Sequence, residues 1–181
     1  GEEVSVAWLY PKQWNGRAVV WLDDRGVLAL QNDHVVKLVR VGVTVVAANL
    51  LFQGDEPVKQ TRVVANRREF AGYTHGYNHA LFAQRVHDVM TLVTFLRNTK
   101  VGSHPNPESV VLAGRGEAGT IALAARALAG SAVDRAAVET GEFLFGKVLD
   151  YRDPMFLPGG SKYLDVPGLI TLNGDRPLQT E

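Results

Sequence analysis

Six residues in the middle of the chain, 114–119 (GRGEAG), restrict its possible folds more than any other segment. They follow a run typical of a buried strand, 109–113 (SVVLA), and precede an Ala- and Leu-rich stretch, 120–129, that is typical of a helix. Glycines allow the chain to reverse sharply here and let the helix approach the strand closely. The segment therefore predicts a tight strand-to-helix turn inside an α/β fold.

Segments typical of strands and of helices alternate along the chain. Runs rich in β-branched and aromatic residues predict strands at 4–10, 17–22, 43–51, 109–113 and 135–140. Apolar periodicity and composition predict helices at 34–41, 80–98 and 120–129. Residues 53–79 and the tail after 140 have no regular pattern, except around 166–172. Because such alternation is typical of βαβ units, we predict an α/β fold, a three-layer sandwich with a mostly parallel central sheet.

Composition and charge argue against several classes of protein. The chain has no cysteine, which excludes disulfides, thiolate nucleophiles and cysteine-bound zinc. Its 19 basic and 19 acidic residues balance, so no nucleic-acid partner is indicated. The longest nearly apolar run, 41–52, is shorter than the roughly 18 residues that span a bilayer, so no membrane span is expected.

The turn at 114–119 has two possible functions. In the first, Gly114, Gly116 and Gly119 form the pattern G-x-G-x-x-G, whose backbone N–H groups bind the pyrophosphate of a dinucleotide at the start of a helix. Glu139, at the end of the next predicted strand, is then placed to bind a ribose. The position of this unit in the middle of the chain, after three earlier strands, argues against the dinucleotide interpretation.

The second interpretation is a nucleophile elbow, the strand-to-helix turn G-x-S-x-G that exposes a catalytic serine at its apex. Alignment of Gly114 with the first glycine places Gly116 where the serine belongs and Ala118 at the second small position. Glycine has no side chain that could attack a substrate. The pattern therefore retains the glycines of the turn but lacks the nucleophile. The chain's serines, at positions 5, 103, 109, 131 and 161, have no elbow-like surroundings.

The order of the predicted elements around this turn favours the elbow. Five stretches support it, namely NGRAVVWLDDRG, GVTVVAANLLFQGD, GYNHALFAQRVHDVMTLVTFLR, VVLAGRGEAGTIALAARAL and FLPGGSKYLDVPGL. Together they resemble α/β-hydrolases of the acetyl xylan esterase and dienelactone hydrolase branch, most closely bacterial members whose elbow lacks the serine. The resemblance covers most of residues 3–178.

The resemblance implies a fold and a site. It assigns one backbone N–H of an oxyanion hole to the turn that ends at Gly26 and the other to Glu117. It also implies a catalytic acid and a histidine after later strands. No histidine follows His104, and we expect Asp175 to precede the strand that leads to the acid. We therefore expect residues 1–181 to form a single α/β-hydrolase-like domain that lacks the last strand or strands and a helix.

The resemblance also implies a function. We expect an esterase-type domain without a serine nucleophile, acting as a non-catalytic or accessory module of a larger esterase-like protein. Its ligand would be a carbohydrate or an acyl ester, its partners the other domains of a parent protein, and no cofactor is expected. Two alternatives stay open. One is an active ester hydrolase completed by other residues, and the other is the dinucleotide-binding domain that uses Gly114, Gly116, Gly119 and Glu139.

The irregular segment before the helix at 80–98 contains further binding candidates. We expect five of its side chains to reach over the elbow and to bind a sugar or an acyl group by stacking and hydrogen bonding. They are Tyr73, His75, Tyr77, Asn78 and His79. The competing interpretation is a folded surface loop that caps the helix. His75 and His79 are four residues apart, but the segment is not helical and the chain has no H-E-x-x-H pattern, so no metal site is expected.

Two carboxylates are candidates of a different kind. Glu117 follows the apex of the elbow, where a buried glutamate either acts as a base or makes the polar interactions that a serine would otherwise make. Asp88 and its neighbour His87 lie on the helix flank opposite Phe82 and Val89. We expect them to form a solvated or locally hydrogen-bonded pair.

Overall fold

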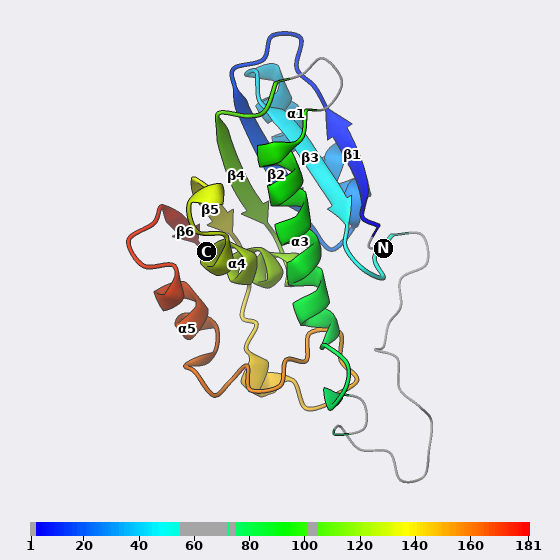
Figure 1. The fold of residues 1–181 in the computed structure, drawn as a ribbon, viewed down its shortest axis with the longest axis vertical. Helices are drawn as coiled ribbons and strands as arrows, with labels where there is room; N and C mark the ends of the chain where they lie inside the picture. Colours follow the sequence, from blue (N-terminus) through cyan, green and yellow to red (C-terminus); the bar gives the residue numbers. More distant parts are fainter. Residues whose placement is uncertain (1–2, 55–71, 73–74, 101–104) are drawn as a thin grey trace.

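The computed structural model describes residues 3–54, 72, 75–100 and 105–181, so that Tyr73, a predicted binding residue, lies outside the described residues. The strands are β1 (Ser5–Leu9), β2 (Arg17–Leu22), β3 (Thr44–Asn49), β4 (Ser109–Gly114), β5 (Arg135–Val138) and β6 (Leu178–Thr180). The α-helices are α1 (Asp33–Arg40), α3 (Leu81–Asn98), α4 (Glu117–Ala129) and α5 (Asp165–Leu172) (Figure 1). Short 3-10 helices occupy Gly26–Gln31, Gly130–Ala132 and Phe145–Lys147.

The described strands form one sheet in the order β1-β3-β2-β4-β5-β6. β1 pairs antiparallel with β3, and the pairs β2–β3, β2–β4, β4–β5 and β5–β6 are parallel. The chain passes from β2 to β3 on one side and then crosses to β4 on the other side of β2. The loops that follow β2 and β4 therefore meet at the carboxyl edge of the sheet, at a topological switch point where α/β folds bind ligands.

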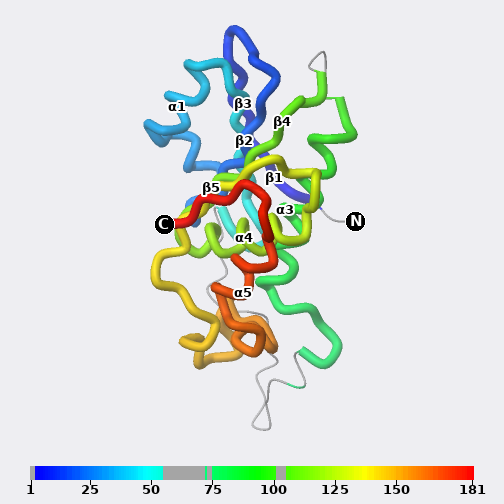
Figure 2. Tube along the Cα trace, turned by 90° about the vertical axis from the view of Figure 1, so that its left-hand side faces the viewer, coloured from blue at the N-terminus to red at the C-terminus, as the bar shows by residue number. Residues whose placement is uncertain are grey.

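Alternating side chains on the central strands point into two separate cores. On β2, Val20 and Leu22 join the core formed with α3 and α4, whereas Val19 and Trp21 join a smaller core on the side of α1. Helices thus lie on both sides of the sheet (Figure 1, Figure 2). These three layers confirm the predicted α/β sandwich with a mostly parallel sheet. No helix in the described part of the chain is long and apolar enough to cross a membrane.

The structure corrects the limits of several predicted elements. α4 begins at Glu117 rather than at residue 120, so the end of the glycine-rich turn is already helical. β5 ends at Val138, which leaves Glu139 beyond the strand. The tail after 140 contains α5 and also β6, which the sequence pattern did not predict. β6 has three residues, two of them exposed and polar, so it lacks the apolar pattern of a buried strand.

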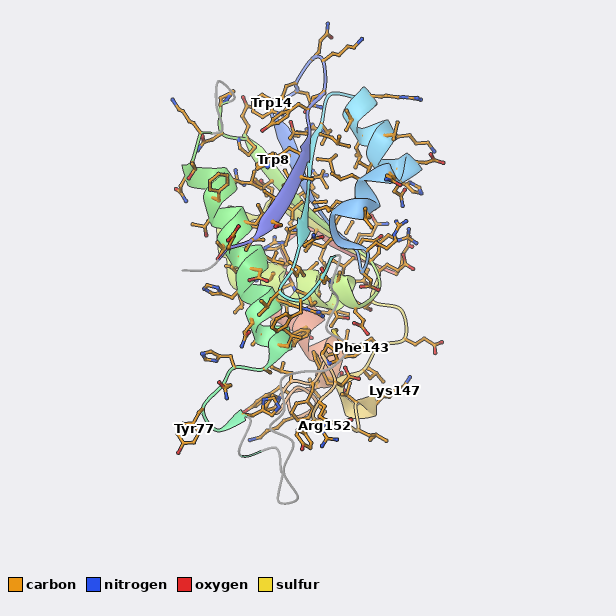
Figure 3. All side chains as sticks on the ribbon, turned by 90° about the vertical axis from the view of Figure 1, so that its right-hand side faces the viewer. Trp8, Trp14, Tyr77, Phe143, Lys147 and Arg152 are labelled. Carbon is orange, nitrogen blue, oxygen red and sulfur yellow. The ribbon has the colours of Figure 1, made fainter. Side chains whose placement is uncertain are left out.

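Loops gather beyond the carboxyl ends of the strands. In Figure 1 the segment between β5 and α5 lies below the sheet, near the chain that leads into α3. Trp8 and Trp14 lie at the opposite end of the molecule from Tyr77 (Figure 3). The two tryptophans are therefore remote from the carboxyl edge of the sheet and from the candidate site.

Candidate functional site

The loop between β4 and α4 is a sharp turn with Gly116 at its apex. Gly116 has φ +65° and ψ −140°, a conformation that L-amino acids rarely adopt. The Arg115 N–H donates to the Leu22 carbonyl at 3.0 Å, which joins the turn to β2. On the other side, the Glu139 N–H donates to the Gly114 carbonyl at 2.8 Å. The turn is thus held from two neighbouring strands and has the strained backbone of a nucleophile elbow.

The other two glycines of the turn allow α4 to lie directly against the sheet. A Cβ at Gly119 would overlap the carbonyl oxygen of Glu139. A Cβ at Gly114 would lie 2.7 Å from the Cβ of Ala122 and 2.9 Å from the Cα of Gly119. Both glycines therefore have a packing role that requires no ligand.

Asp24, in the loop after β2, places its carboxylate over the apex of the elbow. Oδ1 accepts a hydrogen bond from the Ala118 N–H at 2.9 Å, and Oδ2 accepts one from the Glu117 N–H at 3.3 Å. A Cβ on Gly116 would overlap Oδ2 of Asp24. The carboxylate therefore occupies the space in which a nucleophilic side chain would begin. It also caps α4, whose own N-cap residue is a glycine without a side chain.

The two backbone N–H groups assigned to an oxyanion hole both donate within the protein. The Gly26 N–H donates to the Asp23 carbonyl at 2.9 Å, inside its own turn. The Glu117 N–H donates to the Asp24 carboxylate. In this arrangement neither N–H is presented to a substrate oxygen, although the turn around Gly116 is kept.

Glu117 is exposed rather than buried, but its surroundings disfavour its charge. Partial desolvation raises the pKa of its carboxyl, and the negative charges of Asp24 and Asp153 raise it further. The positive charge of Arg85 acts in the opposite direction. The surroundings of Glu117 thus disfavour its charged form, which makes this residue the natural position to test by mutation.

Arg85 and Asp88 on α3 are buried charged residues that both bind the backbone of Leu51, an arrangement that sequence reasoning missed. Arg85 is 4 % exposed, and its Nε donates to the Leu51 carbonyl at 3.0 Å. Asp88 is 5 % exposed and accepts from the Leu51 N–H at 2.6 Å. Asp88 is therefore not solvated, which rules out one of the two expected arrangements of the pair, whereas His87 is exposed. The backbone that follows β3 needs these two polar partners because it leaves the sheet beside a buried helix face.

Replacement of Glu117 by glutamine is expected to change the pH dependence of stability. The pKa of Glu117 is higher in the folded than in the unfolded chain, so the folded protein loses stability as the pH rises through the raised value. Glutamine stays neutral. The free energy of unfolding of Glu117→Gln relative to wild type should therefore increase as the pH rises above about 4.5, the ordinary value, and stay constant below it. Urea titrations at several pH values measure this difference.

Glu142, an exposed glutamate in the loop after β5, offers the matched control. Glu142→Gln removes an equal charge away from the elbow. A difference between Glu117→Gln and wild type that is the same at every pH would contradict the raised pKa.

The described residues of the predicted binding loop contact the segment between β5 and α5 and the start of α3. His75 is half-buried; its Nε2 lies 3.2 Å from the Tyr151 carbonyl oxygen, and its ring lies 5.2 Å from that of Phe156. Tyr77 is 96 % exposed and points away from the body of the molecule (Figure 3). The His79 carbonyl accepts from the Gln84 side chain at 3.0 Å, so the loop contacts the start of α3.

These candidates are thus not gathered into one constellation. Asn78 and His79 are exposed, and His75 turns toward the segment between β5 and α5. Within the described residues, no group of three or more His, Asp or Glu side chains could hold a metal ion. A binding role for His75, Tyr77, Asn78 and His79 stays a prediction.

The residues of the dinucleotide interpretation have other roles. Glu139 forms an ion pair with Arg115 at 2.9 Å, with both side chains partly exposed. The start of α4, where a pyrophosphate would bind, already holds the Asp24 carboxylate. A second negative group at this place would be repelled, so the geometry does not favour a dinucleotide.

Comparison with known proteins identifies the fold. No protein-family model matches the chain, and no curated protein is similar to it. Acetyl xylan esterase 1 from Thermoanaerobacterium sp. is similar in structure with a TM-score of 0.55 and 20% identity, over 75% of this chain and 43% of the esterase. A thermostable carboxyl esterase from Bacillus coagulans, in complex with glycerol, has a TM-score of 0.52 and 13% identity, over 74% of this chain and 38% of the esterase.

A third similar structure is Est1E from Butyrivibrio proteoclasticus with bound ferulic acid. It has a TM-score of 0.52 and 14% identity, and the match covers 96% of this chain and 68% of Est1E. The chain spans less than half the length of the first two structures. The sheet order, the elbow after β4 and these similarities lead to one conclusion: the protein has the α/β-hydrolase fold.

Proposed function

We propose that this chain is an esterase-type domain that has no nucleophile and acts as a non-catalytic or accessory module of a larger esterase-like protein. The observation that carries the proposal is the carboxylate of Asp24, which fills the space above Gly116 and accepts the N–H groups of Glu117 and Ala118. Ester hydrolysis requires an attacking side chain and a free N–H that binds the oxyanion. The Asp24 carboxylate occupies the space of the first and accepts the hydrogen bond of the second.

The charges around the elbow give a second argument against ester hydrolysis. Attack on an ester carbonyl develops a negative charge on its oxygen, which must be stabilised by donors or positive groups. Among the described residues, the carboxyls of Asp24 and Glu117 lie at the turn, and the negative charge of Asp153 helps to raise the pKa of Glu117. A developing oxyanion would meet negative groups, so the site is better suited to bind a neutral ligand than to stabilise the transition state.

A neutral carbohydrate or acyl ester is the ligand class that we propose. Aromatic and imidazole side chains near the carboxyl edge of the sheet can stack on a sugar or an acyl group, and exposed carboxylates can accept hydrogen bonds from hydroxyls. In the described residues, the ring of His75 from the predicted loop lies 6.5 Å from that of Tyr151 and 5.2 Å from that of Phe156. The likeness to acetyl xylan esterase supports an ester-bearing ligand.

The test is hydrolysis of p-nitrophenyl acetate by the purified chain. We expect no turnover above the buffer background, and no change in Glu117→Ala or His79→Ala. Leu128→Ala, at a 69 % exposed position near the other end of α4, serves as the control for loss of activity during preparation. Turnover that disappears in Glu117→Ala or His79→Ala would reveal a serine-free catalytic site and would refute the proposal.

A further inference from the structure

A row of side chains crosses four neighbouring strands on the α1 side of the sheet. Trp21 on β2 pairs with Ala113 on β4, and Ala113 pairs with Ala137 on β5. Ala137 in turn pairs with Gln179 on β6. Residues paired in this way point to the same face, which is the face of the smaller core because Trp21 belongs to it. The two alanines are short, so the row has a low middle between two larger side chains.

The low middle of this row is the floor of a hollow of about 370 Å³, a volume within the usual range of ligand pockets. All four residues of the row line this hollow. The ionisable side chains that line it are His34, Arg115, Glu139 and Glu181. The described lining includes neither Asp24 nor Gly116, so the hollow is separate from the apex of the elbow.

Trp21 brings a buried donor without an acceptor to this hollow. Its side chain is 8 % exposed, and its indole Nε1 has no hydrogen-bond partner among the described residues. The other buried members of the smaller core are apolar and provide no side-chain acceptor. A buried N–H without an acceptor costs free energy, and such groups are rare in folded proteins. Because the same side chain lines the hollow, an acceptor on a ligand there would satisfy this N–H.

The other polar groups of the hollow are mainly acceptors. Glu139 and Glu181 carry carboxylates, and Arg115 is already paired with Glu139 at 2.9 Å. One arginine against two glutamates gives the lining a net negative charge. Such a lining suits a neutral ligand that donates several hydroxyl groups, accepts one hydrogen bond and lays an apolar C–H face on the alanines and the indole. A sugar ring combines these properties.

We propose that this hollow is a binding site for a neutral sugar unit. The Trp21 indole N–H donates to a hydroxyl of the sugar, and the carboxylates of Glu139 and Glu181 accept from other hydroxyls. The inference goes beyond the proposed function, because it places a ligand on the α1 side of the sheet, apart from the elbow and from the loop around His75. It does not depend on the absence of a nucleophile.

Titration of the ¹⁵N-labelled protein with D-glucose, followed by NMR, tests the proposal. The chain has three tryptophans, so three indole N–H peaks are expected, and Trp8→Phe and Trp14→Phe identify two of them. Glucose should shift the Trp21 peak saturably, with a Kd of about 1–10 mM for so small a ligand. The Trp14 peak should not move, because its indole already donates to the Arg17 carbonyl at 3.0 Å and precedes the amino end of β2.

D-Glucuronate tests the charge of the lining. It has the ring of glucose with an added carboxylate, which Glu139 and Glu181 should repel. Its Kd, measured from the same Trp21 peak, should therefore be at least about tenfold higher than that of glucose. Equal or tighter binding of glucuronate would overturn the assignment of a neutral ligand.

Ala137→Leu fills the floor of the hollow. Ala137 is exposed, so the variant should fold, and it should bind glucose at least about tenfold more weakly. The matched control is Ala7→Leu, the same change at a half-buried position of β1 outside the described lining, which should leave glucose binding unchanged. If Ala137→Leu does not fold, Gln179→Ala, at another exposed lining position, should weaken binding in its place.

The possible outcomes separate the sugar site from the proposed function. A Trp21 peak that does not move at about 100 mM glucose, ten times the weakest expected Kd, overturns the site. A shift that persists unchanged in both Ala137→Leu and Gln179→Ala overturns it as well. Hydrolysis of p-nitrophenyl acetate by the same proteins reports on the proposed function alone: turnover in wild type would refute the non-catalytic role, whatever glucose does to the Trp21 peak.

Discussion

Gly116→Ser is expected to lower the free energy of unfolding by about 3 kcal/mol and to create no esterase activity. Two physical effects add to the cost. Gly116 has φ +65°, where any side chain is strained, and a Cβ there overlaps the Asp24 carboxylate. Activity should stay at background because the serine would displace Asp24, and none of the residues that the structure describes at the elbow is a histidine. Urea denaturation and hydrolysis of an acetyl ester measure the two outcomes.

Gly130→Ser separates the two effects. Gly130 follows the other end of α4 with φ +56°, and a Cβ there would meet nothing within 4 Å. Its substitution should therefore cost only the backbone strain, about 1–2 kcal/mol. In the double variant with Asp24→Ala, Gly116→Ser should cost no more than Gly130→Ser does. An equal cost of Gly116→Ser with and without Asp24 would contradict the overlap, and ester turnover in the single variant would contradict the account of the site.

Gly119→Ala is expected to destabilise the protein by about 3 kcal/mol, although the same change in an ordinary helix stabilises it by about 1 kcal/mol. Gly119 lies in the first turn of α4, and its missing side chain lets the helix touch the backbone after β5. A Cβ there would overlap the Glu139 carbonyl oxygen, which is backbone and has no other rotamer to adopt. α4 would have to move away from the sheet. Urea denaturation measures the loss.

Leu128 supplies the internal reference for this prediction. It lies on the same helix and is 69 % exposed, so Leu128→Ala and Leu128→Gly differ mainly in helix propensity. That pair should show alanine to be the more stable residue. If Gly119→Ala were also stabilising, the close approach of α4 to Glu139 would be wrong.

Much of the fold was predictable because buried strands and helices have local apolar patterns. The segments at 17–22 and 109–113 match β2, which is buried after its first residue, and β4, in which buried and half-buried residues alternate. The glycines of 114–119 predicted the turn itself, since a sharp reversal and a close helix have few other solutions. β6 escaped prediction because its three residues depend on pairing with β5 rather than on apolar periodicity.

The candidate site was less predictable than the fold. Gly116 was identified as the apex of the turn, but Asp24 was not identified as the group that covers it. The only local sign was an aspartate in the turn after β2, which gains meaning once β2 and β4 are known to be neighbours. Asp88 was misjudged for the same reason, because its partner is the backbone of Leu51 on another element.

The amino-acid pattern alone thus established the α/β class, most of the element order, the strand-to-helix turn and the absence of a serine at its apex. The tertiary structure decided what replaces the serine, which carboxylates are buried and where the loop around His75 turns. The reason is physical. Apolar periodicity acts over a few residues, whereas the partner of a polar group is chosen by strand order, which brought Asp24 to a helix that begins 93 residues later.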